Sequence, residues 1–287
     1  MKALIVFAIL ISTTCFGQTS RRYWVQFDNK SGTPYSVSTP EDFLTDAAIS
    51  RRNVQGIAIT DSDLPVDPSY VSQLAAIPGI SVVHRSKWFN AISIQTSDST
   101  LIDSVLTYPF VINIDTVKSM RIDDDIEFVT KSLGHTNYHH EYYGMAFRQI
   151  EMHSGHLLHG LGYTGKGITI GVLDAGFTAV DTVGVFASII DDGRLIGTKD
   201  CVDGDNNVYG NSQHGTAVLS CMGANQPGKM VGTAPGANYI LIRSEDVGSE
   251  SLAEEDNWIA GAEYADSLGA DILNTSLGYT TFDDTTS

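Results

Sequence analysis

The chain is poor in basic residues: among its 287 residues, 17 are Lys or Arg and 34 are Asp or Glu, which gives a net charge of −17. Nucleic acids and anionic membrane surfaces are bound by clustered Lys and Arg side chains. We therefore expect neither as a partner. Apolar residues make up 42% of the sequence, as in folded proteins, so the acidity does not indicate disorder. The composition predicts an acidic globular protein without naming its partner.

The sequence also lacks an apolar run long enough to span a bilayer, which takes about 20 residues. A short run begins the chain: after Lys2, residues 3–11 are all apolar, and small and polar residues follow up to Gly17. A positive start, a short apolar core and a small-residue site are typical of a secretory signal. We expect residues 1–17 to be this signal and the mature protein to be secreted or periplasmic, with no membrane partner. The alternative, a lipid-modified Cys15, lacks the aliphatic residue expected before it.

Cysteine is scarce as well. Beyond the predicted signal, Cys201 and Cys221 are the two that remain. In an oxidising compartment they would be able to form a disulfide, but the sequence does not say whether their Cα atoms come within bonding distance. The alternative is a pair of buried thiols that pack as small apolar side chains. The sequence leaves both interpretations open.

After the signal, residues 18–120 alternate between strand-like and helix-like segments. The patterns predict strands at 23–27, 81–83, 91–95 and 111–114, and helices at 41–55 and 100–107. Thr39, followed by Pro40, is predicted to cap the first helix, with Val54 on its apolar face and Gly56 at its end. The order β-α-β-β-α-β is that of a ferredoxin-like α+β domain.

Residues 121–144 show no clean period and are interpreted as an exposed linker. From 145 to 287 strands and helices alternate again. The patterns predict strands at 167–173, 239–242 and 271–277, and helices after His214 and over 254–268. Repeated β-α-β units predict a parallel sheet with helices on both faces.

Two residues of the second region are candidates for chemistry. Asp174 follows the apolar strand 167–173, and functional groups of parallel α/β sheets lie at the carboxyl ends of strands. His214 precedes Gly215 and a helix, so its ring is expected at a helix N-terminus, where the helix dipole disfavours a ring proton. Taken singly, such an Asp is more often a turn residue and such a His more often structural.

Four motifs in this order resemble those of the subtilisin-like serine peptidases (subtilases, peptidase family S8). They are Gly162–Gly176, His214–Val218, Val231–Ala237 and Gly269–Gly278. The resemblance implies a subtilisin-like fold in which Asp174 accepts a hydrogen bond from His214, the general base for a serine nucleophile. Ser276, Leu277 and Gly278 would line the cleft where an extended peptide adds as a strand. A plain buried strand is the alternative for that segment.

One feature of the subtilases is missing. Their nucleophile lies in a Gly-Thr-Ser-Met-Ala-like motif, preceded by an oxyanion-hole Asn, and no such motif follows Gly278. We therefore expect the given polypeptide to lack the Ser nucleophile, to be inactive alone, and to be the amino-terminal part of a peptidase precursor. By position and strand order, residues 18–120 resemble the subtilase propeptide, which blocks the active site until it is removed. An unrelated α/β accessory domain is the alternative.

The resemblance thus implies a secreted serine endopeptidase with protein or peptide substrates and a propeptide-like domain bound in cis. One alternative is a non-catalytic binding or inhibitor protein built on a peptidase-derived scaffold. A nucleotide-binding α/β protein is disfavoured, because no glycine-rich fingerprint follows a strand.

No cofactor is identified from the sequence, and calcium is implied by the family resemblance alone. Residues 203–207 begin like a calcium loop, but Val208 stands where that loop needs glycine, so we interpret them as a polar turn. His153, His156 and His159 recur at a three-residue spacing that drifts around a helix. We interpret them as scattered imidazoles on a helix rim rather than as a metal site.

Overall fold

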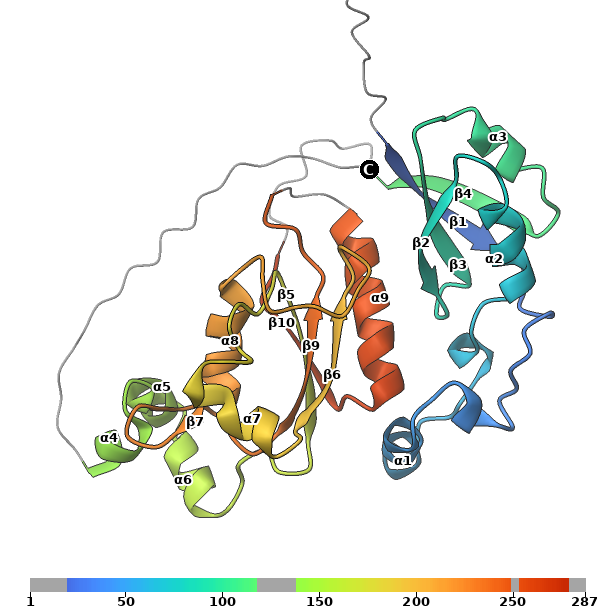
Figure 1. Cartoon of the computed structure of the whole chain (residues 1–287). Helices are drawn as coiled ribbons and strands as arrows, with labels where there is room; N and C mark the ends of the chain where they lie inside the picture. The colour runs from blue at the N-terminus through green and yellow to red at the C-terminus, as the bar shows by residue number, and fades with distance from the viewer. Residues whose placement is uncertain (1–19, 118–137, 249–252, 279–287) are drawn as a thin grey trace, which may run out of the picture.

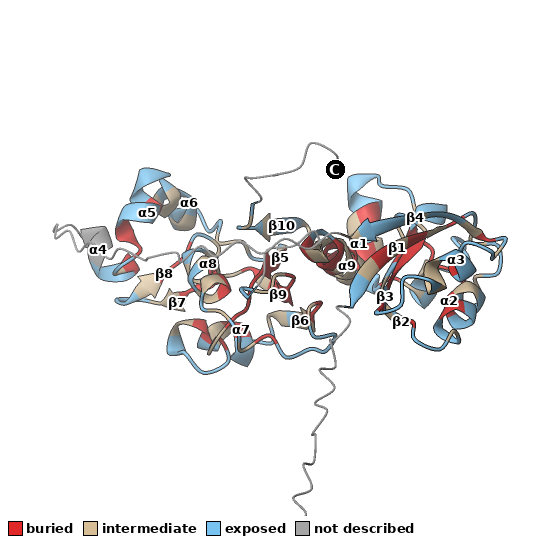
Figure 2. Ribbon diagram, turned by 90° about the horizontal axis from the view of Figure 1, so that it is seen from above, coloured by how far each residue is buried: buried red, intermediate tan, exposed pale blue. Residues whose placement is uncertain are grey.

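The computed structural model describes residues 20–117, 138–248 and 253–278, without the side chains of 138–140. These residues form two units, each built on a four-stranded sheet, and helix α9 (Ala253–Leu268) lies between the two sheets (Figure 1; Figure 2). No helix in the described ranges is long and apolar enough to cross a membrane. The predicted signal, residues 1–17, lies outside the described residues.

The first unit contains an antiparallel sheet in the order β2-β3-β1-β4. Its strands are β1 (Arg21–Phe27), β2 (Ser81–Ser86), β3 (Ala91–Thr96) and β4 (Val111–Val117). Strand β1 is central and pairs with β3 and β4. This order is that of the ferredoxin-like fold, which confirms the fold class predicted for the unit.

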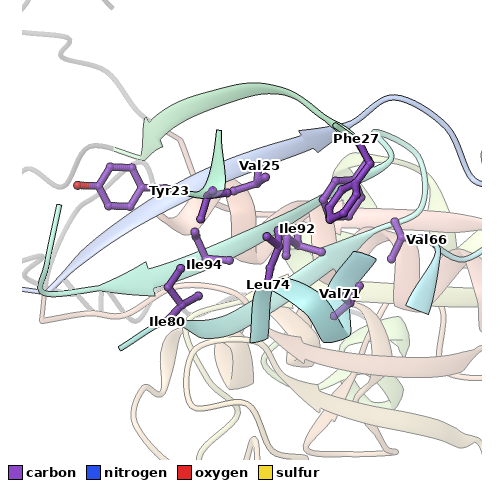
Figure 3. Packing of buried hydrophobic residues seen from close by; sticks show 11 residues of the cluster. Tyr23, Val25, Phe27, Val66, Val71, Leu74, Ile80, Ile92 and Ile94 are labelled. Atoms are coloured by element: carbon purple, nitrogen blue, oxygen red, sulfur yellow. The ribbon is translucent and has the colours of Figure 1, made fainter. Parts of the chain in front are cut away.

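The core of this unit lies between the sheet and helices α2 (Pro68–Ala75) and α3 (Leu101–Val105). Figure 3 shows Leu74 of α2 close to Ile92 of the central strand β3. Both side chains are fully buried, and burial of an aliphatic side chain of this size contributes about 1.5–3 kcal/mol. The sheet face that carries these residues holds α2 and α3 in place.

The predicted first helix is wrong at its start. Residues 40–42 form a single 3-10 turn, and α1 runs from Asp46 to Gln55. Its cap is Thr45, whose hydroxyl accepts a hydrogen bond from the Ala48 amide at 3.3 Å, whereas Thr39 makes no side-chain cap. The predicted end at Gly56 is correct, because this glycine adopts the left-handed conformation (φ 69°) that ends many helices.

The predicted apolar face of this helix is wrong at Val54, which is 85% exposed. Helix α1 does not cover the sheet; it turns Arg51 and Arg52 toward α9. The helices that cover the sheet are α2, which the sequence analysis does not predict, and α3. Eight residues starting at Pro68 are too few to show a clear helical period.

The second unit contains a parallel sheet in the order β10-β5-β9-β6. Its strands are β5 (Thr169–Asp174), β6 (Leu195–Asp200), β9 (Asn238–Arg243) and β10 (Ile272–Thr275). Helix α8 (His214–Gly223) covers one face and α9 the other (Figure 1). Successive residues of β5 serve the two faces: Val172 packs in the core on the α8 side and Leu173 in the core on the α9 side. The predicted parallel sheet with helices on both faces is confirmed.

Shorter elements complete the described chain. They are η1 (Pro40–Asp42), η2 (Asp61–Asp63), α4 (Tyr138–Tyr143), α5 (Phe147–Met152), α6 (Gly155–Gly160), η3 (Gly184–Phe186), α7 (Ala187–Asp191), β7 (Asn225–Gln226) and β8 (Met230–Val231). Helix α4 falls in the predicted linker, 121–144, and its Tyr143 is buried against Ile150 and Val231. The end of that segment therefore belongs to the second unit, while residues 118–137 lie outside the described part.

Helix α9 joins the two units through acidic side chains that face the first unit. The carboxylate of Glu263 accepts hydrogen bonds from the Ser86 hydroxyl (2.6 Å) and from the backbone amides of Lys87 (2.8 Å) and Trp88 (3.1 Å). It thereby satisfies the donors at the end of β2 that the sheet leaves unpaired. The neighbouring Ala262 faces the parallel sheet, so successive residues of one helix contact both units.

Cations of the first unit contact two further carboxylates of this helix. Arg51, Arg52 and Lys87 all contact Asp266, at up to 3.2 Å. Burial raises the pKa of Asp266, but the charges of Lys87 and Arg52 and the hydrogen bond from Arg51 outweigh it and hold the pKa below its ordinary value. At the other end of α9, Arg22 contacts Asp256 at 3.1 Å.

Replacing Glu263 tests the amide-binding role. Glu263→Gln keeps the shape of the side chain but brings an NH₂ group toward buried donors. We expect the free energy of unfolding to fall by about 1–3 kcal/mol, because those donors lose an acceptor. Urea denaturation at neutral pH measures it. The exposed Glu255 of the same helix provides the control Glu255→Gln, and an equal loss in both variants would contradict the assignment.

The lowered pKa of Asp266 predicts that the stability of the fold depends on pH. A carboxyl whose pKa is lower in the folded chain than the ordinary 3.8 stabilises the fold above that pH and loses this effect as the pH falls through the folded value. We expect Asp266→Asn to lower Tm at pH 7 and to flatten the fall of Tm below pH 3.8. Thermal melts over acidic pH measure this. The exposed Asp103→Asn should follow the unaltered chain, and an equally steep fall for Asp266→Asn would refute the prediction.

Candidate active site

Asp174 ends β5 at the carboxyl edge of the parallel sheet, and its side chain is fully buried. Its Oδ1 accepts hydrogen bonds from the Ala175 amide (2.7 Å) and from Nδ1 of His214 (2.8 Å). Burial raises the pKa of Asp174 above its ordinary value, against these two hydrogen bonds, which lower it. Within the described residues, Oδ2 is buried without a hydrogen-bond partner. A positive charge nearby would therefore stabilise the ionised form of this carboxylate.

His214 is the first residue of α8, and two loops hold it in place. Its backbone amide donates to the Ser212 hydroxyl at 3.1 Å. The carbonyl oxygen of Ser212 accepts from the amide (3.1 Å) and the hydroxyl (2.8 Å) of Thr178, in the loop after β5. The hydroxyl of Thr216 in turn donates to the Thr178 carbonyl at 2.9 Å. The loop before α8 is thus bound to the loop that follows Asp174.

The imidazole is both anchored and accessible. Because a carboxylate accepts hydrogen bonds only, Nδ1 of His214 carries the proton shared with Asp174, and Nε2 is left as the basic nitrogen. In the described part of the chain Nε2 makes no hydrogen bond, and the His214 side chain is 31% exposed. A neutral ring in this tautomer can accept a proton from a group placed beside it.

Gly215 allows the close approach of α8 to β5. A Cβ atom at this position would lie 2.9 Å from both Asp174 Cβ and Phe177 Cε1, nearer than real Cβ atoms come to such neighbours, and would also strike the Gly176 carbonyl. The absence of a side chain at Gly215 thus sets the separation at which His214 reaches Asp174.

Ser276, Leu277 and Gly278 lie after β10, at the same carboxyl edge as Asp174. Strand β10 ends at Thr275, and Ser276 and Gly278 are exposed, so the alternative of a plain buried strand is wrong for this segment. Leu277 lines a hollow of about 330 Å³ together with Trp258 and other residues. In the described chain no strand pairs with the outer side of β10. The end of β10 and the segment that follows it therefore border this apolar hollow.

Two family models match this chain. The model of the "Subtilase family" matches residues 165–287, and the "Peptidase S8 propeptide domain, Bacteroidota" matches residues 22–132. The chain belongs to the subtilase family. Its first unit is a propeptide domain, and its second unit has the subtilisin-like α/β fold that the sequence resemblance implies. The propeptide match continues past residue 120, the limit predicted from the sequence.

Curated subtilases of Bacillus subtilis (strain 168) are similar to this one. The minor extracellular protease Vpr is 35% identical over 129 residues, which cover 41% of this chain and 15% of Vpr. Subtilisin E is 28% identical over 165 residues, which cover 56% of this chain and 39% of subtilisin E. The chain therefore matches well under half the length of either relative.

Solved structures share the fold of this subtilase chain. The epidermin leader peptide processing serine protease (EpiP) of Staphylococcus aureus superposes with a TM-score of 0.53 at 14% identity, over 90% of this chain and 50% of that one. Fervidolysin of Fervidobacterium pennivorans, described as a keratinolytic enzyme related to subtilisin, gives 0.52 at 15% identity, over 89% of this chain and 35% of its own. At such identities these likenesses show the fold alone.

Cys201 and Cys221, the cysteines within the described residues, are free thiols. Cys201 is buried, and burial raises its pKa to about 12, so it packs as an inert apolar group. Cys221 is exposed on α8. The disulfide is absent, and the alternative of two buried thiols is correct for Cys201 and wrong for Cys221.

The described residues contain no group of three His, Cys, Asp or Glu side chains placed to hold a metal ion. The three histidines do not share one helix rim: His153 follows α5, while His156 and His159 lie on α6, beyond a left-handed Ser154 (φ 56°). His159 contacts the Tyr143 hydroxyl and the Thr233 carbonyl, each at 3.0 Å.

The loop that begins like a calcium site uses its carboxylates internally. Asp205 accepts from the Asn207 amide at 2.7 Å, and Asp203 is bound to Arg243. These carboxylates do not form a calcium site, which needs six or more oxygen ligands directed at one point. The segment is a polar turn.

Arg243 and Asp200 are two charged residues near the site that the sequence analysis does not predict. They are the last residues of β9 and β6 and are both buried. The rule that singles out Asp174, a polar residue at the carboxyl end of a parallel strand, applies to them equally. Their signal is weak because β6 is only half buried and lacks a clear apolar run.

The substitution Gly215→Ala tests whether the close approach of α8 to β5 requires glycine at this position. We expect Gly215→Ala to lower the free energy of unfolding by about 1–3 kcal/mol, the usual range for overpacking, and to weaken the bond between His214 and Asp174. Urea denaturation and the NMR signal of the His214 Nδ1 proton measure the two effects. Gly160→Ala on α6, where a Cβ meets no atom within 4 Å, is the control. An unchanged Nδ1 signal in Gly215→Ala would contradict the prediction.

Proposed function

We propose that this chain is part of a secreted serine endopeptidase precursor and supplies Asp174 and His214 of an Asp-His-Ser triad. The observation that carries the proposal is the 2.8 Å contact between Asp174 Oδ1 and His214 Nδ1 at the carboxyl edge of a subtilase sheet. This contact joins two residues that are 40 positions apart in the chain and that lie in two different subtilase-like motifs.

In the proposed reaction His214 is the general acid and base. Its Nε2 takes the proton of the serine hydroxyl as the oxygen attacks the peptide carbonyl, and returns that proton to the leaving amine. The imidazolium formed in between lies beside the buried carboxylate of Asp174. The negative charge of Asp174, poorly solvated because it is buried, stabilises that imidazolium relative to a site without a carboxylate. Asp174 therefore favours the charged intermediate state.

The nucleophile is not assigned to a residue of the 287-residue chain. None of the four matched motifs is the Gly-Thr-Ser-Met-Ala-like segment that carries it in the family. We therefore expect the given chain to be inactive alone and a longer product of the same reading frame to be the active form. The serine and the oxyanion-hole Asn would come from that additional sequence.

The substrate would be an extended peptide at the segment Ser276–Gly278. Such a peptide binds by adding a strand to an open sheet edge, with its side chains in adjoining pockets. The hollow beside Leu277 and Trp258 favours an apolar side chain, while Glu254 and Glu255 among its lining residues disfavour an acidic one. The propeptide domain, docked on the neighbouring α9, would stay bound in cis until it is removed.

Secretion rests on residues 1–17, with their positive start and short apolar run. The similar protein Vpr is named as an extracellular protease, which agrees with export of this chain. No nucleic acid or membrane partner is proposed for the mature protein.

Replacing His214 in the full-length precursor tests the activity. We expect His214→Ala to lower casein hydrolysis about 10⁴-fold or more and to leave the propeptide uncleaved. Fluorescent casein and gel analysis of the precursor measure the two. His153→Ala, a histidine exposed after α5, is the control and should process normally.

The rival function, a non-catalytic binding or inhibitor protein, predicts a different result. It requires that the unaltered full-length protein neither cleaves casein nor removes its propeptide. Activity retained by His214→Ala would overturn the triad assignment, whereas inactivity of the unaltered protein would favour the rival.

A further inference from the structure

A buried arginine lies in the same row of the parallel sheet as Asp174. Arg243 ends β9, and its Cα pairs in register with Asp174 on β5 and with Asp200 on β6. Its side chain is buried, and its Nη1 donates to Asp200 Oδ2 at 2.8 Å and also to Asp203. A central strand of the sheet thus ends in a cation that is joined to the neighbouring strand end.

The two carboxylates keep this guanidinium charged and fixed. Burial lowers the pKa of Arg243, but the hydrogen bonds and charges of Asp200 and Asp203 outweigh it and raise the pKa. Asp200 is itself fixed, because its other oxygen accepts from the amides of Val202 (2.8 Å) and Asp203 (2.9 Å). The Arg243 carbonyl also accepts from the Cys201 amide at 2.8 Å. Arg243 is therefore a rigid anchor.

The anchor reaches the loop that carries His214. With its amide oxygen turned to the guanidinium, Asn211 accepts from Nε of Arg243 at 3.3 Å and from Nη1 at 2.9 Å. Asn211 has a left-handed backbone (φ 67°), which asparagine tolerates better than most residues. The next residue, Ser212, accepts from the His214 amide at 3.1 Å. One side chain thus separates the buried arginine from the segment that positions the imidazole.

We propose that Arg243 is a positioning residue for His214: through Asn211 it holds the loop before α8 so that the imidazole stays against Asp174. The catalytic consequence rests on the proposed function, whereas the effect on the imidazole does not. The competing explanation is that Arg243 serves only to pair with Asp200 and thereby to stabilise the fold. The two explanations predict different results for a variant that loses the contact with Asn211 alone.

Asn211→Gly removes that contact and leaves the ion pairs of Arg243 intact. Glycine also accepts the left-handed backbone, so we expect Tm to stay near that of the unaltered chain. We expect the His214 Nδ1 proton to exchange with solvent about tenfold faster, the effect of losing one hydrogen bond to a charged group. NMR of the 287-residue chain measures this without any enzymatic activity.

Asn90→Gly is the matched control. Asn90 also has a left-handed backbone (φ 49°), and its amide donates to the carbonyls of Phe27 and Asn29 at 3.1 Å, in the propeptide domain. The same change of residue there should leave the His214 signal unaltered.

Arg243→Lys is the second variant. A lysine keeps the charge that Asp200 needs, but its single ammonium cannot reproduce the fork that also reaches Asn211. We expect the His214 Nδ1 proton to exchange about as fast in Arg243→Lys as in Asn211→Gly. In the full-length precursor both variants should lower kcat about tenfold with little change in KM, since both residues act through the position of His214.

The proposal is overturned if both variants keep the Nδ1 exchange rate of the unaltered chain. It is also overturned if both lower Tm strongly, since Arg243 would then act through stability. Failure of the proposed function gives a different result: His214→Ala would stay active while the NMR effects of Asn211→Gly persist.

Discussion

The structure depends on a single helix, α9, which packs between two sheets of different domains. Its alanines, Ala262 and Ala265, face the parallel sheet, and its carboxylates face the propeptide domain. A carboxylate of this helix that is buried between the two domains has little access to water, so it needs a donor from the other domain. Glu263 and Asp266 meet this requirement with amides and with cations. The propeptide domain is therefore held at a helix that also covers the parallel sheet.

The same principle governs the carboxyl edge of the parallel sheet. Asp174 and Asp200 end the two strands that flank β9, in the same row of the sheet; both are buried, yet they have different partners. Asp200 meets a permanent cation in Arg243, which makes a fixed ion pair. Asp174 meets an imidazole, whose charge can change during a reaction. The first pair gives the edge rigidity, and the second is suited to proton transfer. Part of the chain's acidity thus lies in buried contacts.

Patterns of period and spacing predict those elements whose burial is strong and local. Strands β1, β3, β5 and β9 carry apolar runs or alternation, and α9 has a long helical period, so each lies close to its predicted place. Strand β6 is missed because it is only half buried, and α2 because it is short. Thr39 and Pro40 satisfy the rules for a helix start, yet the chain makes one 3-10 turn there. The helix begins at Thr45 instead, where the Thr45 amide and hydroxyl both bond to the carbonyl of Ser267 at the end of α9.

The sequence by itself determined the two-domain order, the fold classes and the pair Asp174 and His214, because motifs record residue types at fixed spacing along the chain. Only the tertiary structure decided which carboxylates meet which cations. Arg22 and Asp256 are 234 positions apart, and Arg243 meets Asp200 and Asn211 only after the strands have aligned. Electrostatic contacts of this kind depend on distance in space and on burial, and neither is encoded in a local pattern. The anchor behind His214 is for that reason visible in the fold and absent from the motifs.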